Sequence, residues 1–68
     1  MLTKREEEVL ELLIKGLNNT EISKLLCISN HTTKAHVSSI FSKLHVFNRV
    51  QAVVKYLEIK NNEKYTRY

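Results

Sequence analysis

The sequence predicts an all-α domain built from four short helices. Apolar residues recur every three or four positions along most of the chain, which is the spacing of one helix face. One glycine and no proline occur in 68 residues, whereas an all-β fold needs frequent turn residues. With 43% apolar residues, a chain of this length builds one modest core and a single domain.

The first predicted helix covers residues 4–15. Thr3 precedes it and Glu6 follows three positions later, the arrangement of a capping box, in which each side chain bonds to the other residue's backbone N–H. Glutamates at 6–8 also suit the positive end of the helix dipole. Gly16 stands where a residue with left-handed backbone angles would end the helix.

The second and third predicted helices are joined by a three-residue turn. Asn18 and Glu21 repeat the start signal before a helix over 19–26, and Ser29 is a favourable N-cap for a helix over 30–44. One face of this third helix is predicted to pack on the core, and it consists of Thr33, Val37, Ile40 and Leu44. Two helices joined by so short a turn form a helix-turn-helix.

The fourth predicted helix covers residues 48–60, after an interruption of the apolar pattern at 45–48. A polar tail, 61–68, is expected to fray. The sequence therefore predicts a four-helix bundle with a central helix-turn-helix, formed by residues 1–60.

The fourth predicted helix carries two apolar stripes. One consists of Ala52, Tyr56 and Ile59, and the other of Val50, Val54 and Leu57. A small domain has one core, so either that core wraps this helix on both sides or one stripe contacts a partner.

Positive charge is concentrated in the second half of the chain. Residues 1–28 hold four basic and five acidic side chains, which gives a net charge of −1. Residues 29–68 hold seven basic and two acidic side chains, which gives a net charge of +5. A basic half suits a polyanion, although a basic surface also serves solubility alone.

The outer face of the third predicted helix is small, rich in hydroxyls and free of acids. No Asp or Glu occurs between Ser29 and Phe47, whereas a solvated helix surface usually carries Glu, Lys and Gln. Serine and threonine are mediocre helix formers, so another requirement favours them here. A helix that enters the major groove has this requirement, because small side chains, hydroxyls and cations fit base edges and phosphates. The alternative is a solvent face with a chance run of serines.

Most of the chain resembles the helix-turn-helix domain of LuxR/GerE-type regulators. Its opening matches that pattern at Leu2, Thr3, Arg5, Glu6, Glu8, Val9, Leu10, Gly16, Leu17, Asn19, Glu21 and Ile22. Its turn and third helix match at Ser29, Thr32, Lys34, His36, Val37, Ile40, Lys43 and Leu44. The start of its fourth helix matches at Asn48, Arg49, Gln51 and Ala52.

The resemblance implies a bacterial transcription regulator that binds double-stranded operator DNA as a homodimer. It would be the effector domain of a NarL/FixJ-type response regulator of a two-component system, or a free-standing GerE-like regulator. Thr33 departs from the family's usual valine, and its hydroxyl is expected to bond to the carbonyl one turn back.

We assign DNA contacts from the outer face of the third helix together with the resemblance. The base-facing set is His31, Lys34, Ala35 and Ser38, with Lys34 foremost because lysine reaches a guanine edge. The phosphate-side set is Asn19, Ser29, Thr32, His36, Ser39 and Lys43, several of which a structural role would also explain. The resemblance assigns Val50, Val54 and Leu57 to the dimer interface and Ala52 to the core.

The sequence predicts no enzyme, cofactor, metal site or small-molecule ligand. His31 and His36 are five positions apart and project to different faces of a helix, unlike a metal-binding pair four apart. Cys27 follows an apolar run, as a core cysteine does, and a single cysteine fits the reducing cytoplasm. No signal peptide or membrane-spanning run is visible. The remaining alternatives are a helical protein-interaction module without DNA reading and a promoter-reading region related to sigma factors.

Overall fold

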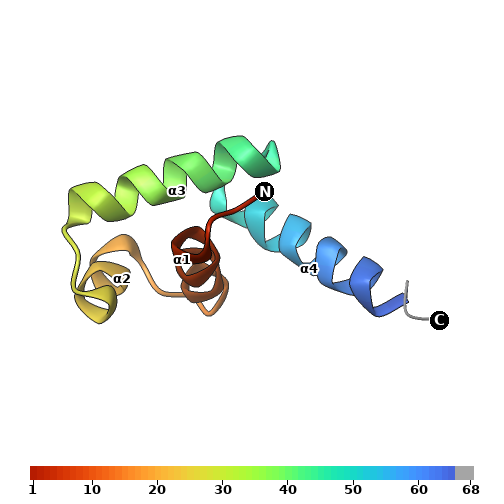
Figure 1. The fold of residues 1–68 in the computed structure, drawn as a ribbon, viewed down its shortest axis with the longest axis horizontal. Coiled ribbons are helices and arrows are strands. Elements are labelled where there is room, and N and C mark those ends of the chain that lie inside the picture. The colour runs from red at the N-terminus through yellow and green to blue at the C-terminus, as the bar shows by residue number, and fades with distance from the viewer. Residues whose placement is uncertain (66–68) are drawn as a thin grey trace.

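Four helices make up the fold. The computed structural model describes residues 1–65, in which no strand occurs, and its helices are α1 (Lys4–Ile14), α2 (Asn19–Leu26), α3 (Asn30–Leu44) and α4 (Arg49–Tyr65). The all-α prediction is therefore confirmed. Figure 1 shows α3 lying across α1 and α2, whereas α4 runs away from the other three helices.

Side-chain caps start the first three helices where the sequence predicts them. The Thr3 N–H donates to Glu6 Oε1 at 2.8 Å, and the Glu6 N–H donates to Thr3 Oγ1 at 3.1 Å. Asn18 and Glu21 form the same reciprocal pair at the start of α2, with both distances 2.8 Å. Ser29 caps α3. Each cap pairs backbone amides that have no partner inside their own helix. Because the capping residues lie within three positions of those amides, these helix starts can be predicted from the sequence.

Left-handed backbone conformations end the first three helices. Gly16, with φ +99°, follows the last turn of α1 as predicted. Cys27 and His45 take the corresponding position after α2 and α3, with φ values of 57° and 59°, although neither is a glycine. The core position expected for Cys27 is wrong, because this residue lies beyond the buried face of α2, and its side chain is exposed.

All four helices contribute to one core. It consists of Val9, Leu10, Leu13, Ile22, Ile40 and Ala52. On α3, Thr33 and Ile40 are fully buried, while Val37 and Leu44 are half-buried at the edge of the core. The stripe predicted for this helix is therefore its inner face.

Two buried hydroxyls join α2 to α3. Thr33 Oγ1 lies 2.6 Å from Ser23 Oγ, which itself donates to the Asn19 carbonyl at 2.7 Å. Since the one hydroxyl proton of Ser23 is used on that carbonyl, Thr33 is the donor to Ser23. The expected bond from Thr33 to a carbonyl of its own helix is thus replaced by one across the helix-turn-helix, because a buried hydroxyl of the facing helix is within reach.

The first turns of α4 attach it to α1. Arg49 Nη2 donates to the carbonyls of Leu13 and Leu17, at 2.7 Å and 2.5 Å. These carbonyls lie near the end of α1, where backbone acceptors lack helical partners. Asn48 Oδ1 accepts the Gln51 N–H at 2.9 Å, so Asn48 caps the helix instead of forming its first turn.

Helix α4 is longer than predicted. It continues to Tyr65, five residues past the expected end at Lys60, so residues 61–65 are helical and not a frayed tail. The rest of that tail, 66–68, lies outside the described residues. Beyond Tyr56, which is half-buried, the described side chains of α4 are exposed, including Ile59, expected in the core stripe. No helix in the described part of the chain is long and apolar enough to cross a membrane.

Candidate nucleic-acid interface

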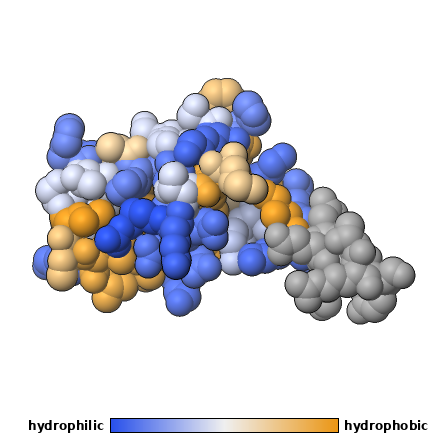
Figure 2. Space-filling model, viewed as in Figure 1, coloured by the Kyte–Doolittle hydropathy of each residue, from blue (hydrophilic) through white to orange (hydrophobic). Residues whose placement is uncertain are grey.

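One face of α3 presents all four residues of the predicted base-facing set to solvent. His31, Lys34, Ala35 and Ser38 are exposed, and the residues between them that point inward pack on the core. Along the upper edge, where Figure 1 places α3, Figure 2 shows mainly blue and pale side chains. Their spacing of three and four places these side chains on one side of the helix, so a single groove could receive all of them.

The N-terminal end of α3 gathers polar groups of the predicted phosphate-side set. Ser29 Oγ accepts the Thr32 N–H at 3.0 Å and donates to Thr32 Oγ1 at 2.9 Å. Asn19 and His36 are half-buried, on α2 and on the flank of α3. Helix N-termini favour anions because unpaired amides and the helix dipole are positive there.

The last two members of that set, Ser39 and Lys43, are bound within the domain. Ser39 Oγ donates to Glu6 Oε2 at 2.5 Å, and Lys43 Nζ donates to Glu6 Oε1 at 2.8 Å. The Glu6 side chain is buried, and the Lys43 side chain is 36% exposed. The structure therefore gives both residues a partner in α1, where the sequence suggested phosphate.

These bonds stabilise the ionised form of Glu6. Hydrogen bonds from Lys43, from Ser39 and from the Thr3 N–H lower the pKa of the Glu6 carboxyl from 4.5 to about 2, against the opposing effect of burial. Because the pKa is lower in the folded state, this carboxylate stabilises the domain at neutral pH.

We expect the Glu6 contribution to disappear on acidification. It is fully present above the unfolded pKa of 4.5 and is lost progressively as the pH falls toward about 2. Chemical denaturation at a series of pH values should show wild type losing stability more steeply than Glu6→Gln over this interval. Parallel profiles for the two proteins would contradict a special role for this carboxylate.

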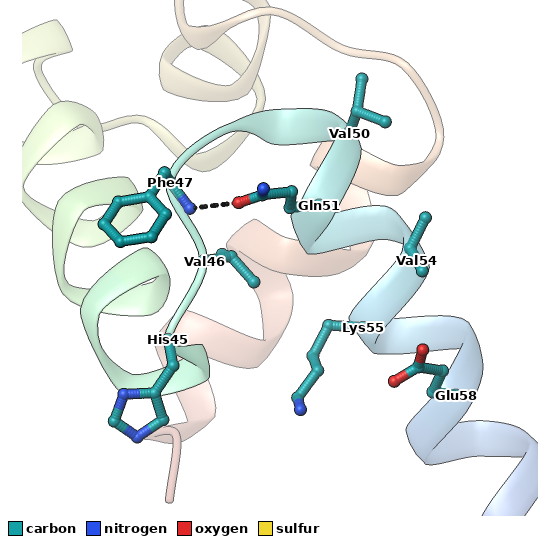
Figure 3. A pocket seen from close by; sticks show the side chains of 8 residues that line it. All are labelled: His45, Val46, Phe47, Val50, Gln51, Val54, Lys55 and Glu58. Carbon is teal, nitrogen blue, oxygen red and sulfur yellow. Dashed lines mark hydrogen bonds between the residues drawn. The ribbon is translucent and has the colours of Figure 1, made fainter.

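Helix α4 exposes the stripe that the resemblance assigns to a dimer. Val50 is 72% exposed, and Val54 and Leu57 are each 51% exposed, whereas Ala52 is buried as predicted. The core therefore does not wrap this helix on both sides. Figure 3 shows Val50 and Val54 along α4, where both line a pocket together with Phe47 of the preceding loop.

No cluster of three or more His, Cys, Asp or Glu side chains suited to a metal ion occurs in the described residues. His31 and Cys27 are exposed at separate places in the helix-turn-helix. The domain therefore presents two surfaces suited to binding, the exposed polar face of α3 and the exposed apolar stripe of α4.

Three residues that organise this surface were not identified from the sequence. The sequence alone predicts for Glu6 a role at the start of its own helix, predicts none for Ser23, and shows Arg49 only as a position that matches the resemblance. Each contacts a residue at least ten positions away, and that information is absent from local patterns. The one available signal was the polar character of Ser23 and Thr33 at positions where helical spacing predicts burial.

Comparison with known proteins identifies the family. Residues 1–56 match the model of the bacterial regulatory proteins of the luxR family. This chain belongs to the luxR family. Membership indicates DNA-binding transcription regulation by a domain that is not an enzyme.

Curated relatives of this luxR-family chain include response regulators. The response regulator protein VraR of Staphylococcus aureus and that of Staphylococcus epidermidis are each 52% identical over 54 residues, or 79% of this chain. That match covers 26% of either relative, so the chain spans about a quarter of their length.

Solved structures of similar proteins show the same fold. The response regulator ChrA of a heme-sensing two-component system superposes with a TM-score of 0.84 and 38% identity, over 88% of this chain and 30% of that one. A chain in the complex of the anti-activator RapF with the response regulator ComA DNA binding domain superposes with a TM-score of 0.78 and 38% identity. The match covers 81% of this chain and 95% of that one.

Proposed function

We propose that this luxR-family domain reads specific sequences in double-stranded DNA by placing the first half of α3 in the major groove. The observation that carries the proposal is the exposed, acid-free face of His31, Lys34, Ala35 and Ser38, backed by the core through Thr33. Small side chains let the helix backbone approach the bases, and Lys34 supplies a donor for a guanine edge. A comparable chain belongs to a complex that contains a DNA binding domain.

Phosphate contacts would flank this helix. Ser29 and Thr32 lie at the N-terminal end of α3, and His36 is half-exposed one turn further along. Asn19 is the first residue of α2, the other helix of the helix-turn-helix. Contacts of this kind orient a protein on the duplex and carry no base information. DNA reading of this kind would take place in the bacterial cytoplasm, where the chromosome lies.

Selection of binding sites from random duplexes tests this function directly. We expect a consensus half-site to emerge and affinity for it to fall steeply with salt, because cations on the protein release counterions from DNA. A protein that enriches no sequence and shifts no duplex at low salt would not be a DNA reader. An enriched site with no preference at bases facing α3 would instead contradict the assignment of the reading helix.

We further propose that the domain acts as a homodimer through α4. The exposed stripe of Val50, Val54 and Leu57 lies on the part of this helix that the core leaves uncovered. A two-fold contact would bury each of these side chains against its own counterpart. Since one helix buries little area, we expect a weak dimer that is reinforced when two half-sites are bound.

Val54→Asp is expected to weaken self-association by about tenfold or more, because two carboxylates would be buried near the two-fold axis without partners. Sedimentation equilibrium over a range of protein concentrations measures the dissociation constant. Thr20→Asp, at an exposed position of α2, introduces the same charge away from α4 and serves as the control. Equal dissociation constants for the two variants would remove α4 from the interface.

A protein partner is the second candidate function. Phe47, which lines the pocket of Figure 3, is 89% exposed, and Leu25 on α2 is 61% exposed. A similar chain lies in a complex with an anti-activator protein. Binding that persists at high salt and needs no duplex would favour this alternative, because apolar contacts are not weakened by screening.

A further inference from the structure

Glu6 is the only charged side chain that is buried among the described residues, and it joins α1 to α3. It is 5% exposed. Its Oε1 accepts the Lys43 ammonium at 2.8 Å and the Thr3 N–H at 2.8 Å, while Oε2 accepts the Ser39 hydroxyl at 2.5 Å. Removing one partner of a buried charge leaves the other uncompensated, so these contacts are strongly maintained in the folded domain.

The two partners on α3 are placed so that they control the orientation of that helix. Ser39 and Lys43 are four positions apart and therefore lie one above the other on one side of α3. A rotation of α3 by one residue, about 100°, or a shift along its axis would break both bonds to the carboxylate. Ser38, adjacent to Ser39 in the chain, belongs to the exposed base-facing set.

We propose that Glu6 is a positioning residue for DNA recognition. Through its bonds to Ser39 and Lys43 it fixes the rotation of α3 about its axis and the position of α3 along that axis, and it keeps Lys43 away from phosphate. This inference rests on the proposed reading of DNA by α3. It replaces the phosphate-side assignment of Ser39 and Lys43 with an internal role. Lys34, exposed and on the outer face, remains the cation of this helix that faces the duplex.

The proposal differs measurably from a simple effect of charge. Removing a negative charge from a DNA-binding domain strengthens binding to every duplex to a similar degree, because the electrostatic contribution does not depend on sequence. Loss of the correct helix orientation has another result. It weakens binding to the selected site, where bases are read, and spares binding to a scrambled duplex, where only phosphates are contacted.

The test compares dissociation constants of the 68-residue chain for a selected duplex and a scrambled duplex of the same composition, by fluorescence anisotropy. Specificity is the dissociation constant for the scrambled duplex divided by that for the selected duplex. We expect Glu6→Gln and Lys43→Met each to lower this ratio by roughly tenfold, and the double variant to lower it no further. Lys43→Arg keeps the bond to Glu6 and should keep the ratio. Glu11→Gln, at an exposed position of α1, makes the same charge change at a carboxylate that forms no hydrogen bond or ion pair with α3 within the described residues, and it should also leave this ratio unchanged.

The salt dependence of binding provides a second readout. Lys43→Met should leave the slope of log affinity against log salt unaltered, whereas Lys34→Ala should lower it by about one. A reduced slope in Lys43→Met would show that this lysine does contact phosphate and would overturn the proposal. A ratio unchanged in Glu6→Gln, or equal losses on both duplexes, would overturn the positioning role.

Circular dichroism establishes that each variant is folded at the assay temperature. Should Glu6→Gln unfold, Lys43→Met and Lys43→Arg carry the test, because both leave the Thr3–Glu6 capping box intact. Failure of the wild-type chain to bind any duplex would overturn the proposed function itself, and it is distinguished from failure of the positioning role before any variant is measured.

Discussion

Replacing Ile40 with alanine is expected to lower the free energy of unfolding by about 2–5 kcal/mol. Ile40 is fully buried in α3 and belongs to the core to which all four helices contribute. Truncation removes apolar surface that was excluded from water and leaves a cavity that neighbouring side chains fill only in part. A domain of 68 residues has a total stability on the order of 3–10 kcal/mol, so this variant should be partly unfolded at physiological temperature.

Urea or thermal denaturation followed by circular dichroism measures this effect. Leu25→Ala is the matched control, because Leu25 is also a large aliphatic residue but is 61% exposed on α2. Its replacement should change stability by no more than about 0.5 kcal/mol. Similar losses in the two variants would mean that Ile40 does not occupy the centre of the core.

Replacing Lys34 with alanine is expected to weaken specific DNA binding by about 1–3 kcal/mol, which is roughly 5- to 150-fold in the dissociation constant. Lys34 is exposed at the middle of the base-facing set, and its replacement removes no core contact. The domain should therefore remain as stable as wild type. Discrimination at one base pair should be relaxed, since the lost donor no longer distinguishes guanine from the other bases.

Binding is measured on the selected duplex and on duplexes that carry each base in turn at the position nearest Lys34. Lys15→Ala, at the exposed C-cap of α1, removes the same charge without a proposed base contact and controls for general electrostatics. If both variants lose affinity equally and retain the same base preference, Lys34 contributes only charge. An assignment to phosphate would then replace the assignment to a base.

Much of the fold could be predicted from local patterns. Thr3, Asn18 and Ser29 mark the starts of α1 to α3, because a helix start needs a side chain to pair its free amides within three residues. Gly16 marks the end of α1 for a similarly local reason. The outer face of α3 could also be predicted, because a helix that buries the face of Thr33 and Ile40 exposes the opposite face.

Two predictions are wrong because the polarity of a segment by itself does not determine burial or helix length. Cys27 has the apolar neighbours of a core residue, yet the backbone leaves α2 at this position and exposes it. Residues 61–65 are polar in sequence, yet they continue α4. Polarity indicates that a segment is not buried, and it does not determine whether an exposed helix ends there.

The sequence by itself determined that this protein has four helices, where the first three begin and which face of α3 is buried, because capping and periodicity act within a few residues. Only the tertiary structure decided that Ser39 and Lys43 bind Glu6 and that Val54 stays exposed. A lysine on a helix surface has the same local pattern whether its partner is a phosphate or a carboxylate of another helix. Packing of α3 on α1 brings that carboxylate within hydrogen-bonding distance, and this proximity is set by the whole core.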